Sequence, residues 1–405
     1  MQNPQRETKL VAVVYDFFPH YRAGIMRALL DSPEYNFVMV GDRIDPDGSI
    51  KEWDAPTERF IYAPCVRLCG HLLWQKNLLR LAMRPDIHSI VFLGNAKWLS
   101  TWLAASLARF SGKRVLFWTH GWVRLEKGVK AFVRRCFYRL AHGLLLYGNW
   151  ARLIGLAEGF PSNRLYVIYN SLDYGVQRRA RASVTERELN SIRNDYCSSP
   201  NSALLIFCGR LIKSCKLNLL VEAMAILKRD GVETSLLLVG DGPEKGSLVQ
   251  MAKELEVRVH FYGACYDENI LARLIMSANV MVSPGKVGLT AMHGFVYGIP
   301  VISHDDAEAQ GPEFEAIIHG KTGALFRRDD VSDLVAAIKK WVAFPWPNEE
   351  ARRECNTMVE RFYNADFQRT VINRAICGLP AEEPDTVLIS QLPWYLKGLN
   401  CGNAN

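Results

Sequence analysis

Short apolar runs alternate with amphipathic stretches along most of this chain. Runs such as LVAVVY at residues 10–15 and LLIF at residues 204–207 predict strands that are buried on both faces of a sheet. Between these runs, apolar residues recur every three or four positions, which is the spacing of helices that pack on such a sheet. We therefore predict an α/β fold in which strands and helices alternate in a doubly wound parallel arrangement.

The alternating pattern occurs twice along the chain. It spans residues 10–168, gives way to a polar stretch that is poor in strand-forming residues, and restarts at residue 203. We expect a first Rossmann-like domain at residues 1–175, a linker with one helix at 176–202, a second Rossmann-like domain at 203–345, and a final helix with a tail at 346–405. Two such domains leave a cleft between them, which is the usual place for a ligand.

One stretch of the second half, VMVSPGKVGLTAMHGFVYGIPVIS at residues 280–303, predicts a complete βαβ unit. A short apolar strand leads into the turn Ser283-Pro284-Gly285, an amphipathic helix ends near Gly298, and a second apolar strand follows. In a parallel sheet such a turn lies at the carboxyl edge, where the first N–H groups of the helix and its dipole suit a phosphate. A βαβ unit that serves only as scaffold is the alternative.

The composition is that of a folded protein without a membrane span. Of 405 residues, 49% are hydrophobic and 22% are charged, and no run approaches the ~20 apolar residues that cross a bilayer. The polar amino terminus lacks the layout of a signal peptide, so we expect a cytoplasmic protein. The ten cysteines include no CxxC pair, which predicts reduced thiols and no metal site.

Basic residues concentrate between residues 113 and 152, within a formal net charge of +7. The run KGVKAFVRRCFYRLAHGLLL places apolar residues at helical spacing among Lys and Arg, which predicts a basic amphipathic helix. Such a helix could rest on the anionic cytoplasmic face of an inner membrane or face an acidic partner. The alternative is a solvated helix whose apolar stripe is core. No nucleic-acid-binding module accompanies the charge, so nucleic acid is not an expected partner.

Ordered motifs in the second half resemble those of a known family. They are FCGRL at 207–211, LLVEAM at 219–224, LLLVGDGPE at 236–244, VHFYG at 259–263, GIPVIS at 298–303 and HGKTGALF at 319–326. Together they resemble the nucleotide-sugar-binding half of GT-B glycosyltransferases, in the retaining "glycosyl transferases group 1" family of the bacterial cell-surface glycan type. The first half is similar more loosely, through FWTHGW at 117–122 and YNSLD at 169–173, and the likeness covers roughly residues 10–342.

The resemblance implies a GT-B fold and a hexosyltransferase activity. A sugar would pass from a nucleotide-sugar donor of the UDP or GDP type to a hydroxyl of a glycan or glycolipid acceptor. The acceptor would be a lipid-linked precursor in lipopolysaccharide or other polysaccharide biosynthesis. The resemblance also implies retention of anomeric configuration, no metal, and no cofactor beyond the donor as co-substrate. In this fold the last helix commonly crosses back to the first domain.

A departing nucleoside diphosphate carries negative charge, so its site must supply cations and N–H donors. By resemblance, Arg210 binds the diphosphate, with Gly209 beside it at the end of a strand. The family's partner Lys aligns with Cys215, and we assign its role to the neighbouring Lys216. His120, at the end of a strand in the first half, matches a His that faces the donor sugar. We thus expect His120, Arg210 and Lys216 to serve catalysis.

The chain departs from the family in its central βαβ unit. The family carries two Glu residues separated by seven others, and the matching positions hold Gly285 and His293. We expect Gly285 to permit close approach of a ligand to the backbone, and His293 to hydrogen-bond ribose hydroxyls. Further donor contacts are assigned to the N–H groups of Lys286, Val287 and Gly288 and to the carboxylates of Glu313 and Glu315.

The acceptor side and the type of reaction each allow more than one interpretation. Tyr15, Asp16 and the loop that ends at Arg22 would line the acceptor side, with Asp16 either a base or a helix cap. Because both family carboxylates are missing, a catalytically silent GT-B scaffold or partner subunit is an alternative function. A sugar-nucleotide epimerase of the same fold is another. Product analysis separates them, since an epimerase converts free sugar nucleotides, a transferase needs an acceptor, and a scaffold does neither.

Overall fold

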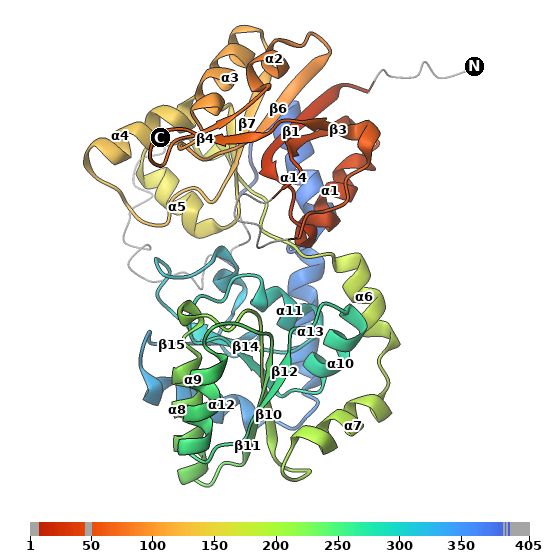
Figure 1. Ribbon diagram of the computed structural model, residues 1–405, viewed down its shortest axis with the longest axis vertical. Helices are drawn as coiled ribbons and strands as arrows, with labels where there is room; N and C mark the ends of the chain where they lie inside the picture. Colours follow the sequence, from red (N-terminus) through yellow and green to blue (C-terminus); the bar gives the residue numbers. More distant parts are fainter. Residues whose placement is uncertain (1–7, 45–50, 384, 386–387, 389–405) are drawn as a thin grey trace. The chain divides into compact units, whose positions relative to one another are not determined.

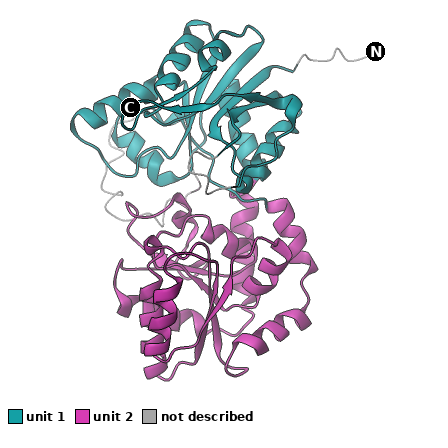
Figure 2. Cartoon of the chain, viewed as in Figure 1, with its two compact units in different colours: residues 1–173, 365–384, 399–405 teal, residues 174–364, 385–398 magenta. Residues whose placement is uncertain are grey.

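The computed structural model describes residues 8–44, 51–383, 385 and 388. The described chain forms two compact units (Figure 2). Unit 1 contains the described residues up to Asp173 together with residues 365–383, and unit 2 contains residues 174–364 with residues 385 and 388. The end of the tail, at residues 389–405, lies outside the described residues.

Unit 1 is built on a seven-stranded parallel sheet with the strand order β3-β2-β1-β6-β7-β8-β9 (Figure 1). The strands are β1 (Leu10–Phe17), β2 (Asn36–Asp42), β3 (Phe60–Tyr62), β6 (Ile87–Leu93), β7 (Arg114–Thr119), β8 (Gly143–Leu146) and β9 (Leu165–Val167). A separate antiparallel pair consists of β4 (Cys65–Arg67) and β5 (Leu73–Gln75). The middle strands are buried along most of their length, which explains their continuous apolar runs.

The helices of unit 1 include one from the far end of the chain. They are α1 (Ala23–Leu30), α2 (Leu78–Met83), α3 (Leu99–Phe110), α4 (Gly128–Arg139), α5 (Asn149–Ala157) and α14 (Ala365–Cys377). α14 packs against α1 and contacts β7 and β9. Its residues Ile372, Ala375 and Ile376 are buried in one cluster with apolar side chains of β1 and α1. The final helix therefore completes the core of unit 1.

Unit 2 carries a six-stranded parallel sheet with the order β12-β11-β10-β13-β14-β15. The strands are β10 (Ala203–Cys208), β11 (Thr234–Val239), β12 (Val259–Gly263), β13 (Val280–Val282), β14 (Val301–His304) and β15 (Gly323–Phe326). The helices that follow them include α8 (Leu217–Arg229), α9 (Lys245–Glu254), α10 (Glu268–Met276), α11 (Thr290–Val296) and α12 (Val331–Val342). The predicted α/β fold with two Rossmann-like domains is confirmed.

Two helix predictions were wrong. The stretch 176–202, predicted to hold one helix, holds α6 (Tyr174–Ser183) and α7 (Glu186–Tyr196), and both pack against α10. Thr185 starts α7 with a capping box, in which its side chain accepts the N–H of Glu188. The single final helix is instead divided into α13 (Glu349–Arg361) and α14. Within the described ranges, none of the helices is long and apolar enough to cross a membrane.

Candidate functional site

Two loops of unit 2 meet backbone to backbone at the carboxyl edge of its sheet. Gly209 follows β10, and its N–H donates to the carbonyl of Val239 at 3.0 Å. Leu211 N–H donates to the carbonyl of Asp241, also at 3.0 Å. Gly240 has a φ of +152°, and a Cβ there would lie 1.8 Å from the carbonyl oxygen of Gly209. Glycine at position 240 therefore allows the loops after β10 and β11 to pack closely.

The turn after β13 closes on the same loop. Gly285 N–H donates to the carbonyl of Cys215 at 3.0 Å, and a Cβ at position 285 would lie 2.0 Å from the carbonyl oxygen of Ser214. The close neighbour of Gly285 in the structure is the protein backbone, and the predicted close approach of a ligand to this glycine stays a prediction. A glutamate, which the family has here, does not fit unless the turn moves away from Ser214.

The N–H groups predicted to hold donor oxygens differ in their surroundings. Lys286 N–H donates to the carbonyl of Ser214 at 3.4 Å, and Val287 N–H donates to Oε1 of Gln310 at 2.9 Å. These two donors are engaged inside unit 2. A Cβ placed at Gly288, by contrast, would meet no atom of the described chain within 4 Å. Open space at this turn therefore borders Gly288.

The two predicted cations of unit 2 lie in the loop after β10. Arg210 is exposed. Lys216 lies between the 3-10 turn η4 (Lys213–Cys215) and α8, with a left-handed φ of 50°. Its Nζ pairs with the Asp329 carboxylate, and the two side chains are 28% and 53% exposed. A pair this exposed to solvent contributes ~0–1 kcal/mol, so separating Lys216 from Asp329 costs little.

Next to this loop, His304 carries no charge at neutral pH. Burial lowers the pKa of His304 to about 4, and the positive charge of Arg328 acts in the same direction. Arg328 in turn pairs with Asp306 at 2.6 Å, and the Asp306 N–H donates to His304 Nδ1 at 3.2 Å. The positive charge at this edge therefore comes from Lys and Arg side chains.

His293, on α11, lies in a polar cluster that sequence reasoning missed. Its Nδ1 is 3.5 Å from Nε2 of Gln177, which also donates to the carboxylate of Glu268 at 3.3 Å. The hydroxyl of Tyr297 donates to the same carboxylate. Burial lowers the pKa of His293 although the charge of Glu268 opposes this, so the imidazole is neutral. Glu268 begins α10 and belongs to no motif that links it to residue 293.

Glu313 and Glu315 lie on the short 3-10 helix η5 (Pro312–Ala316), and both are buried. The structure thus places these carboxylates in the interior of unit 2, and a role for them in donor contacts stays a prediction. Among the described residues, no group of three or more His, Cys, Asp or Glu side chains is arranged to hold a metal ion.

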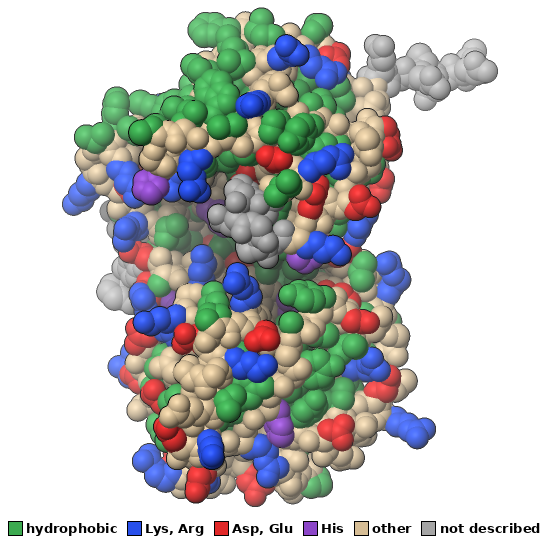
Figure 3. Space-filling view, viewed as in Figure 1, with side chains coloured by type: hydrophobic (Ala, Val, Ile, Leu, Met, Phe, Trp, Pro, Cys, Tyr) green, Lys and Arg blue, Asp and Glu red, His purple; other side chains and the backbone are tan. Residues whose placement is uncertain are grey.

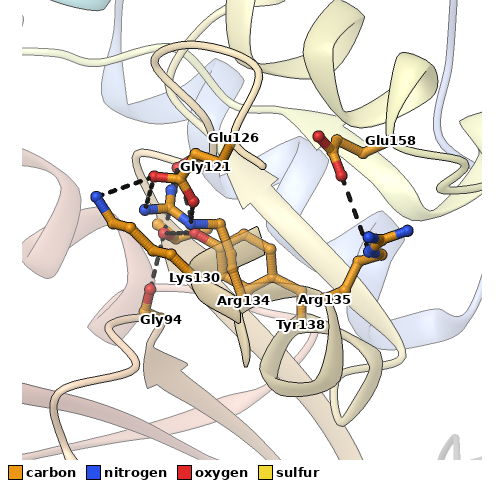
Figure 4. Close-up of polar contacts among 9 residues, drawn as sticks. Gly94, Gly121, Glu126, Lys130, Arg134, Arg135, Tyr138 and Glu158 are labelled. Carbon is orange, nitrogen blue, oxygen red and sulfur yellow. Dashed lines mark hydrogen bonds and ion pairs between the residues drawn. The ribbon is translucent and has the colours of Figure 1, made fainter. Parts of the chain in front are cut away.

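His120 belongs to unit 1, where it follows β7. It is exposed, and its ring centroid is 4.7 Å from that of Tyr147. The next residue, Gly121, is fixed by α4, because Arg134 donates to its carbonyl at 2.8 Å and pairs with Glu126 at 2.9 Å (Figure 4). Arg134 is thus part of the framework of the His120 turn, although it belongs to the basic helix.

A pocket of about 420 Å³ opens at the amino-terminal edge of the sheet in unit 2. It contains none of the predicted site residues and is lined by Ser198, Met224, Lys228, residues 231–234 and residues 256–258. Within unit 2, the structure brings together Gly209, Lys216 and Gly285 at the opposite edge. That edge is the candidate site.

Residues 190–359 match the family model described as Glycosyl transferases group 1. Curated relatives include N-acetyl-alpha-D-glucosaminyl L-malate synthase of Bacillus anthracis, 28% identical over 176 residues that cover 42% of each chain. They also include GDP-mannose-dependent alpha-(1-6)-phosphatidylinositol dimannoside mannosyltransferase of Mycobacterium tuberculosis (strain ATCC 25177 / H37Ra), 31% identical over 165 residues that cover 40% of each chain. The chain matches about two fifths of the length of these relatives.

Solved structures match over more of the chain. The lipopolysaccharide outer core galactosyltransferase WaaB in its apo form has a TM-score of 0.66 at 18% identity, covering 91% of this chain and 99% of that one. Alr3699/HepE of Anabaena in complex with UDP has a TM-score of 0.68 at 14% identity, covering 92% and 100%. At these identities the likeness shows the fold, which is GT-B.

Proposed function

Because residues 190–359 match the family model of the glycosyl transferases group 1, we propose that this chain is a glycosyltransferase that moves a hexosyl group from a nucleotide-sugar donor to an acceptor hydroxyl. The observation that carries the proposal is the loop with Arg210 and Lys216, which touches the turn at Gly285. Cations and backbone N–H groups at such an edge suit the charge that develops on a departing diphosphate. We assign the donor site to this edge of unit 2.

The donor would be a UDP or GDP sugar. One relative is named as GDP-mannose-dependent, and HepE was solved in complex with UDP and with UDP-glucose. In this assignment Arg210 and Lys216 bind the diphosphate, the turn at Gly288 receives donor oxygens, and the neutral His293 bonds ribose hydroxyls. The contact of His120 with the donor sugar stays a prediction from the resemblance. Retention and the absence of a metal or further cofactor rest on the family resemblance alone.

The acceptor would be a lipid-linked glycan at the cytoplasmic face of a membrane. Two similar proteins are named for lipid-linked acceptors, a phosphatidylinositol dimannoside and a lipopolysaccharide outer core. In unit 1, hydrophobic side chains gather on the surface over α2, α3 and α4 (Figure 3). Phe110 of α3 is 92% exposed, and Val129 and Phe132 of α4 are 80% and 63% exposed, close in sequence to the exposed Lys127 and Lys130. The apolar stripe of α4 is therefore only partly core, and this surface suits an anionic membrane.

Vesicle binding tests the membrane part of the proposal. Replacing Val129 and Phe132 with Asp should reduce co-sedimentation with phosphatidylglycerol vesicles by about tenfold, because two buried apolar contacts with lipid are lost. Val249→Asp is the matched control, since Val249 is an exposed apolar residue of unit 2. Equal binding of the double variant and the wild type would remove the membrane assignment.

Product analysis tests the reaction itself. The purified chain is incubated with radiolabelled UDP and GDP sugars, with and without membrane glycolipids, and the products are separated. Transfer of label to the glycolipid fraction, with one anomeric configuration, is the expected result. Conversion of the free sugar nucleotide without an acceptor would identify an epimerase instead.

One observation favours a second candidate, a GT-B scaffold without catalysis. Position 285 has no room for the side chain of a glutamate, because a Cβ there would lie 2.0 Å from the Ser214 carbonyl oxygen. A chain that binds nucleotides weakly or not at all, and yields no product with any donor, would support this candidate.

A further inference from the structure

Unit 1 holds a buried cation at the carboxyl edge of its sheet. Arg22 ends the 3-10 turn η1 (His20–Arg22), just before α1, and is 9% exposed. Its Nη1 donates to the hydroxyl of Tyr15, in β1, and its Nη2 donates to the hydroxyl of Tyr147, which follows β8. These two hydroxyls are 3.1 Å apart. The fold thus fixes a guanidinium where parallel sheets usually bind ligands.

The groups around Arg22 do not neutralise its charge. In the part of the chain that the structure describes, no Asp or Glu forms an ion pair with Arg22. Burial raises the pKa of Tyr15 well above its usual value, so this phenol is neutral. The rings of Tyr15, Trp118 and Tyr147 have centroids 4.9, 5.5 and 5.2 Å from the guanidinium carbon. Aromatic faces stabilise a cation in part, but a desolvated guanidinium without a carboxylate is costly.

A second observation at the same place indicates that a hydrogen-bond acceptor is missing. The indole Nε1 of Trp118 is buried and has no hydrogen-bond partner among the described residues. Arg22 itself has five guanidinium N–H groups, and two of them serve the tyrosine hydroxyls. The buried Trp118 N–H is therefore a donor without an acceptor beside the guanidinium. An anion with several oxygen atoms would balance the charge and accept from this donor.

We propose that Arg22 binds an anionic group of the acceptor, a phosphate or a carboxylate, in a subsite that Tyr147 and Trp118 complete. This proposal rests on the proposed transferase function and on the expectation that the loop that ends at Arg22 lines the acceptor side. Tyr147 also packs against the exposed ring of His120, with 4.7 Å between the two ring centroids. The planar fork of arginine suits both anions, because two oxygens can accept in parallel.

Direct titration with small anions tests the subsite without using the transferase reaction. Inorganic phosphate and malonate are titrated into the full chain by calorimetry, with tryptophan fluorescence as a second signal. Arg22→Met should weaken the affinity for at least one of these anions by tenfold or more. Arg27→Gln is the matched control, since Arg27 lies on the neighbouring α1 and forms a half-exposed pair with Asp173. It should bind as the wild type does.

Stability separates a ligand-binding role from a structural one. If Arg22 serves a ligand, Arg22→Met removes an uncompensated buried charge, and its melting temperature should equal or exceed that of the wild type. Arg22→Lys keeps the charge but loses the planar guanidinium. This variant should fold, and it should bind the anion more weakly than the wild type does. A lower melting temperature of Arg22→Met together with unchanged anion affinity of Arg22→Lys would overturn the proposal.

Titration with a nucleotide shows whether the anion at Arg22 belongs to the acceptor or is the diphosphate of the donor. UDP affinity should be unchanged in Arg22→Met, while the anion binding that Arg22→Met removes should be unchanged in Arg210→Ala. Loss of UDP binding in Arg22→Met would mean that the anion is the donor diphosphate, which contradicts the assignment to the acceptor. Because the anion titrations need no donor, they remain informative even if no nucleotide binds.

Discussion

The carboxyl edges of the two sheets hold their cations in opposite ways. In unit 2, Lys216 and Arg328 are partly exposed, and each pairs with a carboxylate. In unit 1, Arg22 is buried and meets two hydroxyls and three aromatic rings. An exposed pair exchanges its partner for a ligand at little cost, whereas a buried cation is already desolvated. We infer that unit 2 binds anions by exchange and that unit 1 offers a site arranged in advance.

The largest expected effect concerns the backbone that shapes the edge of unit 2. Gly285→Glu restores the carboxylate of the family, but its Cβ would approach the Ser214 carbonyl oxygen to 2.0 Å. We expect a loss of about 3 kcal/mol in the free energy of unfolding, as for an overpacked core, together with loss of nucleotide binding. Urea denaturation and calorimetry measure the two effects.

Gly246→Ala provides the control for this substitution. Gly246 lies in α9, and a Cβ there would meet no atom of the described chain within 4 Å. Alanine should stabilise the helix by about 0.5–1 kcal/mol. Wild-type stability and tighter nucleotide binding in Gly285→Glu would show that the turn adapts, and the assigned role of Gly285 would be wrong.

The second expected effect is a dependence of the stability of unit 2 on pH. His304 binds a proton near pH 4 in the folded state, whereas an unfolded His does so near pH 6.5. Protons therefore favour the unfolded chain between these two pH values. The contribution of neutral His304 to the free energy of unfolding is lost as the pH falls from about 6.5 to about 4. The loss should reach about 3 kcal/mol.

Denaturation of the wild type and of His304→Asn at several pH values measures this effect. Asparagine can still accept the Asp306 N–H, which His304 Nδ1 accepts at 3.2 Å, and it does not titrate. The variant should therefore lose less stability than the wild type over the same range. Identical pH profiles for the two proteins would show that His304 is not the group responsible.

The smallest expected effect tests exchange at Lys216 directly. Lys216→Ala should weaken nucleoside diphosphate binding by about tenfold, which corresponds to ~1.4 kcal/mol. Asp329→Asn removes the carboxylate that competes for Lys216, so it should leave binding unchanged or tighten it by up to about threefold, with stability changed by less than ~1 kcal/mol. Weaker binding in Asp329→Asn would mean that Asp329 positions Lys216, and the exchange account would fail.

The regular elements could be predicted because their cores leave a strong local signal. β11, α8 and α10 follow the apolar patterns expected of buried strands and of helices with one buried face. α6 and α7 were missed as a pair because they are polar overall, with buried positions limited to residues such as Ala180 and Leu189. Their stability comes from packing on α10, which a local pattern does not report.

The site was less predictable because its contacts join distant parts of the chain. Gly285 was expected to allow close approach of a ligand, which stays a prediction. Its neighbour in the structure is Ser214, which contributes only a backbone carbonyl that no sequence pattern marks. Glu268 reaches His293 through Gln177, which comes from a segment interpreted as a linker. The loop that ends at Arg22 was expected on the acceptor side, but no motif marked Arg22 itself, because its burial among three aromatic rings depends on residues from distant strands.

Calorimetric titration of nucleotides tests the donor site of unit 2 most directly. The full chain is titrated with UDP, GDP, dTDP, CDP and their common sugar conjugates, alongside Arg210→Ala and the control Arg229→Ala, whose side chain is exposed at the end of α8. We predict one preferred nucleotide with micromolar affinity, lost in Arg210→Ala and kept in Arg229→Ala. No binding across the panel by the folded protein, or unchanged affinity in Arg210→Ala, would contradict the donor site proposed here.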